Sequence, residues 1–534
     1  MKTFFSFLLV ILPLLSQAQR LGHEHTDFFG GPVGNTYLSL KLPDSNKGFI
    51  LTGYTTDTSN SGIVPPNPTG LGQLFVRFDS AGRQKKIWLV PTVEGAGRMI
   101  QTPDGNVVCQ SIDYTTNWAG DILIYKMNPL TGNILWRKTY GSSQQENVWD
   151  MIPTADGGFL IAGSSRGADG DIPSNHTPAG GFPPADYVLI KTDSLGNKQW
   201  LKVLGTSGDD DHFVDLYAIG NAYYFITETI PKDYEFADTA RYPLSKGMKH
   251  SCLVKLDTSG NILFSRTIAP GRHYNSLFDA TDSSFVIAGA IWGNAAYPPF
   301  SQGSIQGSAD VTLVKTDLEG NVIWAKVMGF PSEEGGKYVV TIPSQVGYIV
   351  SADRGGTDGV VSPITTNYEI ELFEVDLQGN LVDTFRLGGP DTDYSQNLFT
   401  HLGKVYVVGK TSSPWFFPPV QAVRPYNTVK STTSVSRFGL WPLGISRLSE
   451  TVKPLFRISP NPTRGAGFRV DFLSPHHGGR LRLYDAGGAL SGSWNIPAGT
   501  AAWDYPMPQP TPGTYLLQWQ QKDGKTDTQK LLVQ

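Results

Sequence analysis

The sequence predicts an all-β protein, namely a seven-bladed β-propeller of four-stranded blades followed by a small immunoglobulin-like β-sandwich. Three observations lead to this prediction. The chain of 534 residues contains 59 glycines and 37 prolines but only 17% charged residues, which disfavours long helices. A strand–turn–strand phrase recurs at intervals of about 50 to 64 residues. Hydrophobic residues at 40% and aromatic residues at 11% predict a large buried core.

The first 18 residues are typical of an export signal. Lys2 supplies a positive charge, and residues 4–15 form an apolar run that is too short to span a bilayer. Ser16, Gln17 and Ala18 form a small-residue cleavage site, so we expect cleavage after Ala18. No cysteine follows the apolar run, which argues against a lipid anchor. The predicted destination is secretion or the cell surface.

The two cysteines are expected to be buried free thiols. Cys109 and Cys252 both lie in strand-like runs, and they are two repeat units apart. A disulfide requires Cα atoms within roughly 7 Å, so this separation argues against a bridge between them.

The repeated phrase is an apolar strand that ends in an acidic or amide residue, then a glycine turn, then a strand with an aromatic residue. Six copies occupy residues 75–88, 123–136, 188–200, 252–264, 312–324 and 372–385. Their turn glycines are Gly82, Gly132, Gly196, Gly260, Gly320 and Gly379. Such a period suits a four-stranded unit with one variable loop better than a helical solenoid.

A second phrase, rich in β-branched and aromatic residues, precedes each copy of the first and occurs seven times. Its copies begin at Gly48, Asn106, Gly158, Tyr223, Ser284, Gly347 and Val405. Each unit then contains four antiparallel strands, which we name a to d in chain order. The seventh unit lacks strand d, and residues 27–40 resemble residues 385–398, which span the end of a strand d and the next strand a. The N-terminal strand is therefore expected to complete the last blade of a propeller over residues 19–450.

The repeated side chains have structural explanations. One large aromatic residue per blade is expected to pack between neighbouring sheets: Trp88, Trp136, Trp200, Phe264, Trp324 and Phe385. Aspartates before the glycine turns are expected to accept hydrogen bonds from backbone amides: Asp79, Asp193, Asp257, Asp317 and Asp376. Lysines that alternate with apolar residues are expected to be solvated or to snorkel: Lys126, Lys191, Lys255 and Lys315.

The repeat resembles one found in secreted propeller proteins of Gram-negative bacteria that use the type IX secretion system. The best copy runs from Gly157 to Gly205, and the resemblance covers about residues 27–449. It implies a fold and a cell-surface setting. Residues 126–136 also resemble blades of pyrroloquinoline-quinone dehydrogenases, in which that motif docks blades and carries no chemistry. The sialidase Asp box does not match, because residues 193–196 are one residue too long and lack its threonine.

Residues 451–534 form short alternating strands divided by glycine and proline turns, the pattern of a small immunoglobulin-like sandwich. They resemble the type IX secretion C-terminal sorting domain. The matching landmarks are Pro460, Asn461, Pro462, Tyr484, Asp485, Gly488, Gly513, Tyr515 and Lys530. The resemblance implies recognition by the type IX secretion machinery and its sortase, and attachment of the processed chain to surface lipopolysaccharide. The alternative is an ordinary immunoglobulin-like module.

Ligand binding is expected on the face where the b–c and d–a loops emerge. The b–c loops are long and carry aromatic residues, among them Tyr54, Phe182, Trp292, Tyr297, Trp415 and Phe416. Exposed aromatics on such loops suit a glycan or protein ligand. The alternative is that these side chains fold back over the ends of the blades.

No cofactor is expected, except that clustered acidic residues could supply oxygen ligands to calcium: Asp169, Asp171, Asp209 and Asp211. The net charge of −4 gives no electrostatic footprint for nucleic acid, which is not an expected partner. Common nucleophile, phosphate-binding and metalloprotease motifs are absent from the sequence. Three functions remain open: non-catalytic binding of glycan or protein, a polysaccharide hydrolase or lyase, and a purely structural surface protein.

Overall fold

The structure is a computed structural model. It describes residues 19–29, 36–44, 47–56, 72–91, 97–115, 118–177, 183–208, 210, 214–231, 233–236, 249–292, 298–300, 309–330, 333–342, 346–355, 368–388, 391–412, 415–416, 421–422, 432–442, 456–459, 467–473, 478–484, 490–506, 513–521 and 526–533. The chain divides into a larger compact unit of residues 25–438 and a smaller unit that contains residues 439–534. The predicted export signal, residues 1–18, lies outside the described residues.

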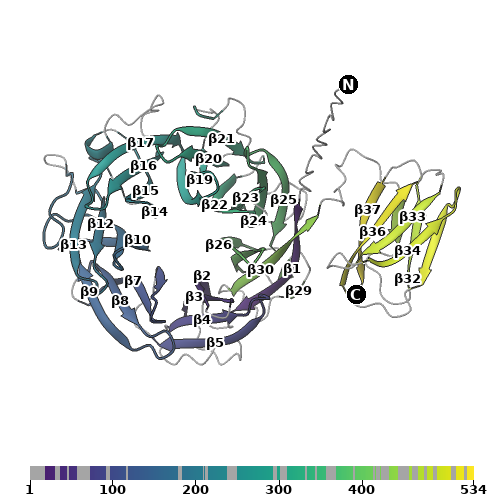
Figure 1. Cartoon of the computed structure of the whole chain (residues 1–534), viewed down its shortest axis with the longest axis horizontal. Helices are drawn as coiled ribbons and strands as arrows, with labels where there is room; N and C mark the ends of the chain where they lie inside the picture. Colours follow the sequence, from purple (N-terminus) through teal and green to yellow (C-terminus); the bar gives the residue numbers. More distant parts are fainter. Residues whose placement is uncertain are drawn as a thin grey trace, which may run out of the picture. The chain divides into compact units, whose positions relative to one another are not determined.

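The larger unit is a β-propeller. Its described residues form four-stranded sheets around a ring, in which the first strand of each sheet lies nearest the centre and the last lies outermost (Figure 1). Among the described residues the one helical segment is a short 3₁₀ turn, η1 (Tyr234–Phe236). No helix in the described part of the chain is long and apolar enough to cross a membrane.

The sheets follow one another in chain order. The first three consist of β2 (Thr36–Pro43), β3 (Phe49–Thr55), β4 (Gly72–Phe78) and β5 (Gln84–Pro91), then β6 (Met99–Gln101), β7 (Val107–Asp113), β8 (Asp121–Met127) and β9 (Ile134–Tyr140), then β10 (Glu146–Pro153), β11 (Phe159–Ser165), β12 (Asp186–Thr192) and β13 (Lys198–Leu204). The next consists of β14 (Val214–Ile219), β15 (Ala222–Thr229), β16 (His250–Asp257) and β17 (Ile262–Pro270). In each of these sheets the strands pair in sequence order, as the repeated phrases predict.

The remaining strands show how the ring is joined. They are β18 (Arg272–Asp279), β19 (Ser284–Trp292), β20 (Ala309–Asp317) and β21 (Val322–Met328), β22 (Glu333–Thr341), β23 (Gly347–Gly355), β24 (Glu369–Asp376) and β25 (Leu381–Leu387), and β26 (Asp393–His401), β27 (Lys404–Thr411), β30 (Thr432–Pro442) and β1 (Gln19–Phe29). A single parallel bridge, Ala309 to Glu333, links the first two groups. The N-terminal strand β1 pairs with β30 as the outer strand of the last sheet, as expected from the similarity between residues 27–40 and 385–398.

Neighbouring sheets are locked by the aromatic residue of strand d. The indole Nε1 of Trp200 donates a hydrogen bond of 3.2 Å to the carbonyl of Thr258 in the c–d turn of the next sheet. The turn glycine Gly260 has φ +81°, and a Cβ there would lie 3.1 Å from the Trp200 ring. Trp88 and Trp324 donate to the next turn in the same way. The expected packing of these aromatics between sheets is confirmed.

The aspartates before the turn glycines cap those turns, as predicted. Asp193 Oδ1 accepts hydrogen bonds from the backbone N–H groups of Leu195 (2.9 Å) and Asn197 (2.8 Å). The equivalent pattern recurs at Asp257 and Asp317. Because these carboxylates accept from backbone amides, they fix the turn rather than perform chemistry.

The prediction that the strand c lysines are solvated or snorkel is wrong for two of them. The side chain of Lys191 is only 3% exposed, and its Nζ donates to Asp156 Oδ2 at 2.7 Å. Lys315 is buried as well and pairs with Asp282 at 2.5 Å. Both partners lie in the a–b turn of the same sheet. A buried ammonium is tolerated there because it has a carboxylate and further acceptors within reach.

The cysteines are free and buried, as predicted. Cys109 lies in β7 and Cys252 in β16, in separate clusters of core residues. Burial raises the pKa of the Cys109 thiol to about 12, which keeps it protonated at neutral pH.

The smaller unit is a two-sheet β-sandwich. One sheet contains β31 (Phe456–Ser459), β32 (Gly467–Phe472) and β35 (Ala502–Pro506), and the other contains β34 (Leu490–Ile496), β33 (Gly479–Tyr484), β36 (Gly513–Gln521) and β37 (Thr526–Val533). The sheets share one hydrophobic core, to which Phe468 and Val470 contribute from the first sheet and Leu481 and Trp519 from the second. Alternating inward-facing residues, as in the run Leu517 and Trp519, produce this arrangement.

Candidate ligand-binding site

A cavity of about 280 Å³ lies beside three inner strands of the propeller, β18, β22 and β26. It is lined by Tyr274, Lys337, Tyr338, Asp353, Tyr394, Ser395 and Gln396. The lining residues of β18 and β26 are near the starts of those strands, and Asp353 is near the end of β23. In an antiparallel sheet these ends meet on the side where the b–c and d–a loops emerge. The cavity therefore lies toward the face on which the sequence predicts ligand binding.

β-Bulges place three of the lining side chains. The register of β18 against β19 shifts between His273 and Asn275, so Tyr274 is the extra residue. The same shift makes Lys337 the extra residue of β22 and Gln396 the extra residue of β26. A bulge bends the strand and changes the direction of its unpaired side chain. Three bulges at equivalent positions thus bring an aromatic ring, an ammonium group and an amide to one cavity.

The cavity contains a loosely paired cation and anion. Lys337 Nζ lies 3.6 Å from Asp353 Oδ2 and 4.6 Å from the centroid of the Tyr274 ring. The other carboxylate oxygen of Asp353 accepts a 2.7 Å hydrogen bond from the backbone N–H of Ser395. Burial raises the pKa of Asp353 to about 6, and the charge of Lys337 opposes that rise. At neutral pH the pair offers an N–H donor beside a carboxylate acceptor.

Tyrosine rings form the apolar part of the cavity. The Tyr394 ring lies 5.2 Å from the ring of Tyr368, centroid to centroid, and Tyr274 carries the ammonium of Lys337 on its face. Burial raises the pKa of Tyr338 to about 12, so its hydroxyl stays protonated. Protonated tyrosines combine a ring face for stacking with a hydroxyl that donates and accepts hydrogen bonds.

One residue predicted to bind ligand lies next to this cavity. Trp292, at the end of β19, is 38% exposed, and the guanidinium of Arg272 lies 5.5 Å from its ring centroid. The charge of Arg272 also acts on Tyr274, a cavity residue two positions further along β18. Burial raises the pKa of Tyr274, and the charge of Arg272 opposes that rise. Trp292 is thus joined to the cavity through Arg272.

Tyr54, another residue predicted to bind ligand, is not among the residues that line the cavity. Tyr54 is 36% exposed on β3, in the first sheet, where its backbone pairs with Tyr37 and Gln73. Trp415 and Phe416 form the short strand β28 (Trp415–Phe416), which pairs with β29 (Gln421–Ala422). Phe182 and Tyr297 lie outside the described residues.

One loop aromatic folds back over the blade ends, the alternative that the sequence left open. Phe300 is 4% exposed and belongs to the core cluster that contains Phe285 and Val314. Sequence reasoning missed Tyr274, Lys337 and Gln396, because nothing in a linear strand pattern marks a bulge. The composition of these strands gave no further signal, because their first halves are largely polar, as in residues 272–276 and 393–397.

The acidic segment predicted as a cation site contacts protein groups. Asp169 accepts hydrogen bonds of 2.7 Å from the backbone N–H and hydroxyl of Ser143, and these bonds lower its pKa. Asp171 pairs with Lys198. Asp209 and Asp211 lie outside the described residues. The described part of the chain has no group of three or more His, Cys, Asp or Glu side chains placed to hold one metal ion.

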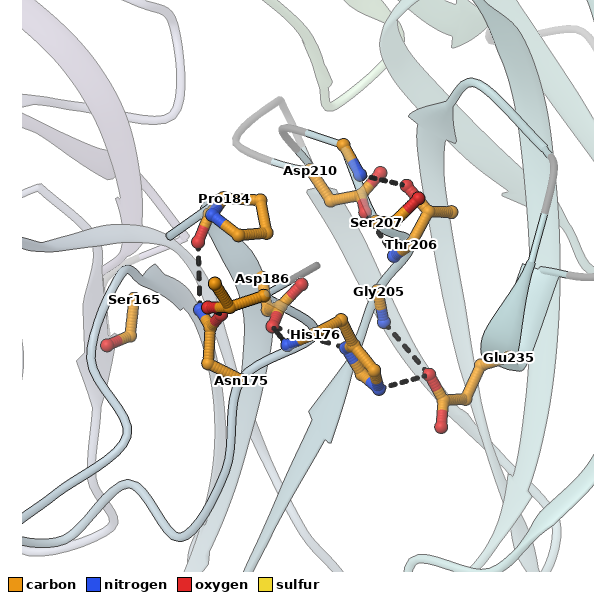
Figure 2. A network of polar contacts seen from close by, with 12 residues as sticks. Ser165, Asn175, His176, Pro184, Asp186, Gly205, Thr206, Ser207, Asp210 and Glu235 are labelled. Atoms are coloured by element: carbon orange, nitrogen blue, oxygen red, sulfur yellow. Dashed lines mark hydrogen bonds and ion pairs between the residues drawn. The ribbon is translucent and has the colours of Figure 1, made fainter. Parts of the chain in front are cut away.

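A polar network connects the loop after β11, in the third sheet, with η1, in the loop between β15 and β16 of the fourth sheet (Figure 2). The imidazole of His176 lies between two carboxylates, with Nδ1 3.2 Å from Asp186 Oδ2 and Nε2 3.3 Å from Glu235 Oε2. Glu235, in η1, also accepts a 3.1 Å hydrogen bond from the backbone N–H of Gly205. Both ring nitrogens of His176 therefore face protein carboxylates, and the network holds two loops together.

Asp210 is a buried member of the same region (Figure 2). Its carboxylate accepts hydrogen bonds from the backbone N–H of Thr206 (2.5 Å) and from the hydroxyl of Thr229. Burial raises the pKa of Asp210 to about 6. This carboxylate therefore fixes the d–a loop between β13 and β14 by bonding Thr206 of that loop and Thr229 at the end of β15.

Four of the predicted sorting-signal residues lie in strands of the sandwich. Tyr484 ends β33, Gly513 begins β36, Tyr515 follows in β36, and Lys530 in β37 pairs with Leu516. The Tyr515 side chain packs against the sandwich core. The remaining landmarks lie outside the described residues: Pro460, Asn461, Pro462, Asp485 and Gly488.

Comparison with known proteins gives only weak structural similarities. No family model matches the chain, and no curated protein matches it. Among solved structures, the quinohemoprotein alcohol dehydrogenase of Comamonas testosteroni is similar at 12% identity and a TM-score of 0.40, over 83% of this chain and 79% of that one. The Pan2 WD40 domain of Neurospora crassa is similar at 11% identity and a TM-score of 0.37, over 78% of this chain and 92% of that one. A prolyl endopeptidase is similar at 12% identity and a TM-score of 0.42, over 92% of this chain and 55% of that one. TM-scores this low assign neither a family nor a function to the chain. The assignment of the fold depends on the sheet topology.

Proposed function

We propose that this chain is a secreted propeller that binds a saccharide, without catalysis, in the cavity beside β18, β22 and β26. The observation that carries the proposal is the position of Lys337 Nζ, 3.6 Å from Asp353 Oδ2 and over the Tyr274 ring. A sugar hydroxyl both donates and accepts hydrogen bonds, so it can engage the ammonium and the carboxylate together. The C–H face of a sugar ring can stack on tyrosine.

The cavity favours binding over glycoside hydrolysis. Among the described residues that line it, Asp353 is the single carboxylate. A glycosidase ordinarily uses two carboxyl groups roughly 5 to 10 Å apart, one on each side of the scissile bond. The hydroxyls and amide of Tyr394, Ser395 and Gln396 can recognise a polar ligand without cleaving it.

We count seven blades. Strands β18–β21 and β22–β25 are joined by one bridge, and each set of four otherwise pairs within itself, so we assign them to two blades. The pairing of β1 with β30 supports closure of the ring by the N-terminal strand. Such closure leaves the propeller with short, protected edges.

Export and surface attachment remain part of the proposal. The C-terminal sandwich forms a compact unit with its own core, and it resembles the type IX sorting domain in sequence. Its partners would be the type IX secretion machinery and its sortase, with surface lipopolysaccharide as the attachment site. In this setting the propeller would meet polysaccharides outside the cell.

Saccharide binding can be tested with the mature chain, residues 19–534. A glycan array would identify retained saccharides, and titration calorimetry would measure their affinity for wild type, Lys337→Met and Gln396→Ala. Gln378→Ala is a matched control, because Gln378 is exposed in the c–d turn between β24 and β25. We expect both cavity variants to lose at least about tenfold in affinity, or about 1.4 kcal/mol, and the control to bind as wild type.

Two results would contradict the proposal. One is an array on which no saccharide is retained. The other is a retained saccharide that binds the cavity variants as tightly as the wild type, provided that all variants melt at similar temperatures. A parallel assay for new reducing ends would detect hydrolysis, and turnover that depends on Asp353 would replace binding with catalysis.

A further inference from the structure

We propose that the saccharide is acidic, and that its anionic residue lies against Arg272 and Trp292 beside the cavity. This inference rests on the proposed saccharide binding and names the class of sugar. It is based on a continuous row of alternating aromatic and cationic side chains, which we call the cationic path: Trp292, Arg272, Tyr274 and Lys337.

Arg272 is the outer cation of this path. It is the first residue of β18, is exposed, and stacks its guanidinium on the Trp292 ring at 5.5 Å. Among the described residues no carboxylate pairs with Arg272, whereas Lys337 faces Asp353. A guanidinium that is stacked on an aromatic ring keeps its N–H edge available for a planar anion. This geometry suits a carboxylate better than a neutral hydroxyl.

Contacts join Arg272 to the cavity without a gap. Arg272 and Tyr274 are two positions apart on β18, where the charge of Arg272 acts on Tyr274, and the ring of Tyr274 carries the ammonium of Lys337 at 4.6 Å. A saccharide with one residue in the cavity would therefore place a neighbouring residue beside Arg272. The Trp292 ring, which is partly exposed, offers a stacking surface there.

The nearby carboxylates are engaged by other groups, so the cations of the path are not fully neutralised. Glu228 accepts hydrogen bonds from the Lys249 ammonium (3.1 Å) and from the backbone N–H of His273 (2.8 Å). Asp353 is the single acid beside the path that contacts one of its cations, Lys337, among the described residues. Two cations facing one acid leave a local excess of positive charge, which favours an anionic ligand.

The test compares sugars that differ only in charge. The mature chain would be titrated with a tetrameric oligogalacturonate and with the same tetramer fully methyl-esterified, and with a sulfated oligosaccharide and its desulfated form. We expect the acidic member of at least one pair to bind at least about tenfold more tightly, and this preference to weaken as salt increases. The two pairs distinguish a carboxylate from a sulfate as the recognised group.

Three variants test whether the preference for acidic sugars depends on the cationic path. Arg272→Gln should abolish the preference for the acidic sugar, so that the acidic and neutral members of a pair bind this variant with similar affinity. Trp292→Ala should weaken both sugars. The control Arg83→Gln removes an exposed cation from the turn between β4 and β5 and should have no effect.

The outcomes separate this inference from the proposed function. If neutral and acidic sugars bind equally and Lys337→Met weakens both, saccharide binding stands and the acidic preference is overturned. If no saccharide binds, the proposed function fails and the inference fails with it. A preference for acidic sugars that survives Arg272→Gln would also overturn the assignment to the cationic path.

Discussion

Replacing the turn glycine Gly196 by alanine should weaken the contact between the second and third blades. Gly196 has φ +76°, and a Cβ at this position would lie 2.9 Å from Cζ3 of Trp136 in the preceding sheet. Gly157 provides a matched control, since its φ is +80° and its Cβ would meet nothing within 4 Å. Both substitutions force an L-residue into the left-handed region, and only Gly196→Ala also crowds the neighbouring sheet.

The two costs can be separated in magnitude. The left-handed conformation costs about 1 to 2 kcal/mol for a residue with a Cβ. Overpacking against Trp136 adds about 1 to 3 kcal/mol, so Gly196→Ala should destabilise by about that much more than Gly157→Ala. With an unfolding entropy of about 2.1 cal/mol/K per residue over about 400 residues, this excess corresponds to a Tm roughly 1 to 4 °C lower.

Differential scanning calorimetry on the mature chain would measure the excess, and chemical denaturation would check it. Adding Trp136→Leu removes the ring that the new Cβ meets but leaves Lys138 Cγ, 3.0 Å from that Cβ, so in that background the excess cost of Gly196→Ala should become smaller. Equal destabilisation by Gly196→Ala and Gly157→Ala in the wild-type background would refute the reasoning. An excess that is undiminished in the Trp136→Leu background would show that the crowding does not arise from the Trp136 ring.

Three further predictions follow from the described contacts. Asp156→Asn should lower the free energy of unfolding by about 1 to 3 kcal/mol more than Lys191→Met in denaturant titrations. The first substitution leaves the buried Lys191 ammonium without its carboxylate, whereas the second leaves Asp156, which is half exposed and can be hydrated. Equal losses would contradict this prediction. Asp210 and Asp353 have pKa values near 6 in the folded chain, above their unfolded value, so the native state binds more protons and stability should fall as the pH rises from 4 to 7, by up to about 2 to 3 kcal/mol for each group. Asp210→Asn should flatten this dependence, and an unchanged slope would refute the assignment. Deletion of residues 451–534 should retain the propeller in the periplasm of a host with type IX secretion, as fractionation and surface proteolysis would show; surface display of the truncated chain would refute a sorting role.

Local patterns in the sequence predicted the parts of the fold that depend on neighbouring residues. The aspartate-capped turns, exemplified by Asp193 and Asn197, are set within five residues of chain, so the phrase itself contains their hydrogen bonds. The aromatic of strand d was also predictable, because its ring must meet the next blade at every repeat. Cys109 and Cys252 were correctly expected to be buried, because both lie in strand-like runs, and to be free, because they are two repeat units apart.

Features that depend on contacts across strands were not predictable from the pattern. Lys191 alternates with apolar residues and so resembles a surface lysine, yet its partner Asp156 lies in a turn 35 residues earlier. The cavity depends on three bulges, in β18, β22 and β26, and these strands are far apart in the sequence. A sequence without pairing information does not show which residue of a strand is unpaired.

The candidate site uses bulge positions whose backbone geometry recurs from one inner strand to the next, whereas their side chains differ. Five inner strands each have a register shift at or before the middle of the strand, so the backbone geometry of the bulge repeats around the ring: β2, β10, β18, β22 and β26. The side chain at the bulge does not repeat, being Trp149 in β10 and Tyr274, Lys337 and Gln396 in the three strands beside the cavity. The backbone repeat therefore provides equivalent positions on the inner strands. The side chains that differ between these positions decide what each position can bind. On this argument the ligand of the propeller is determined by its least repetitive inner-strand residues, and substitutions there should change binding while leaving the blade contacts intact.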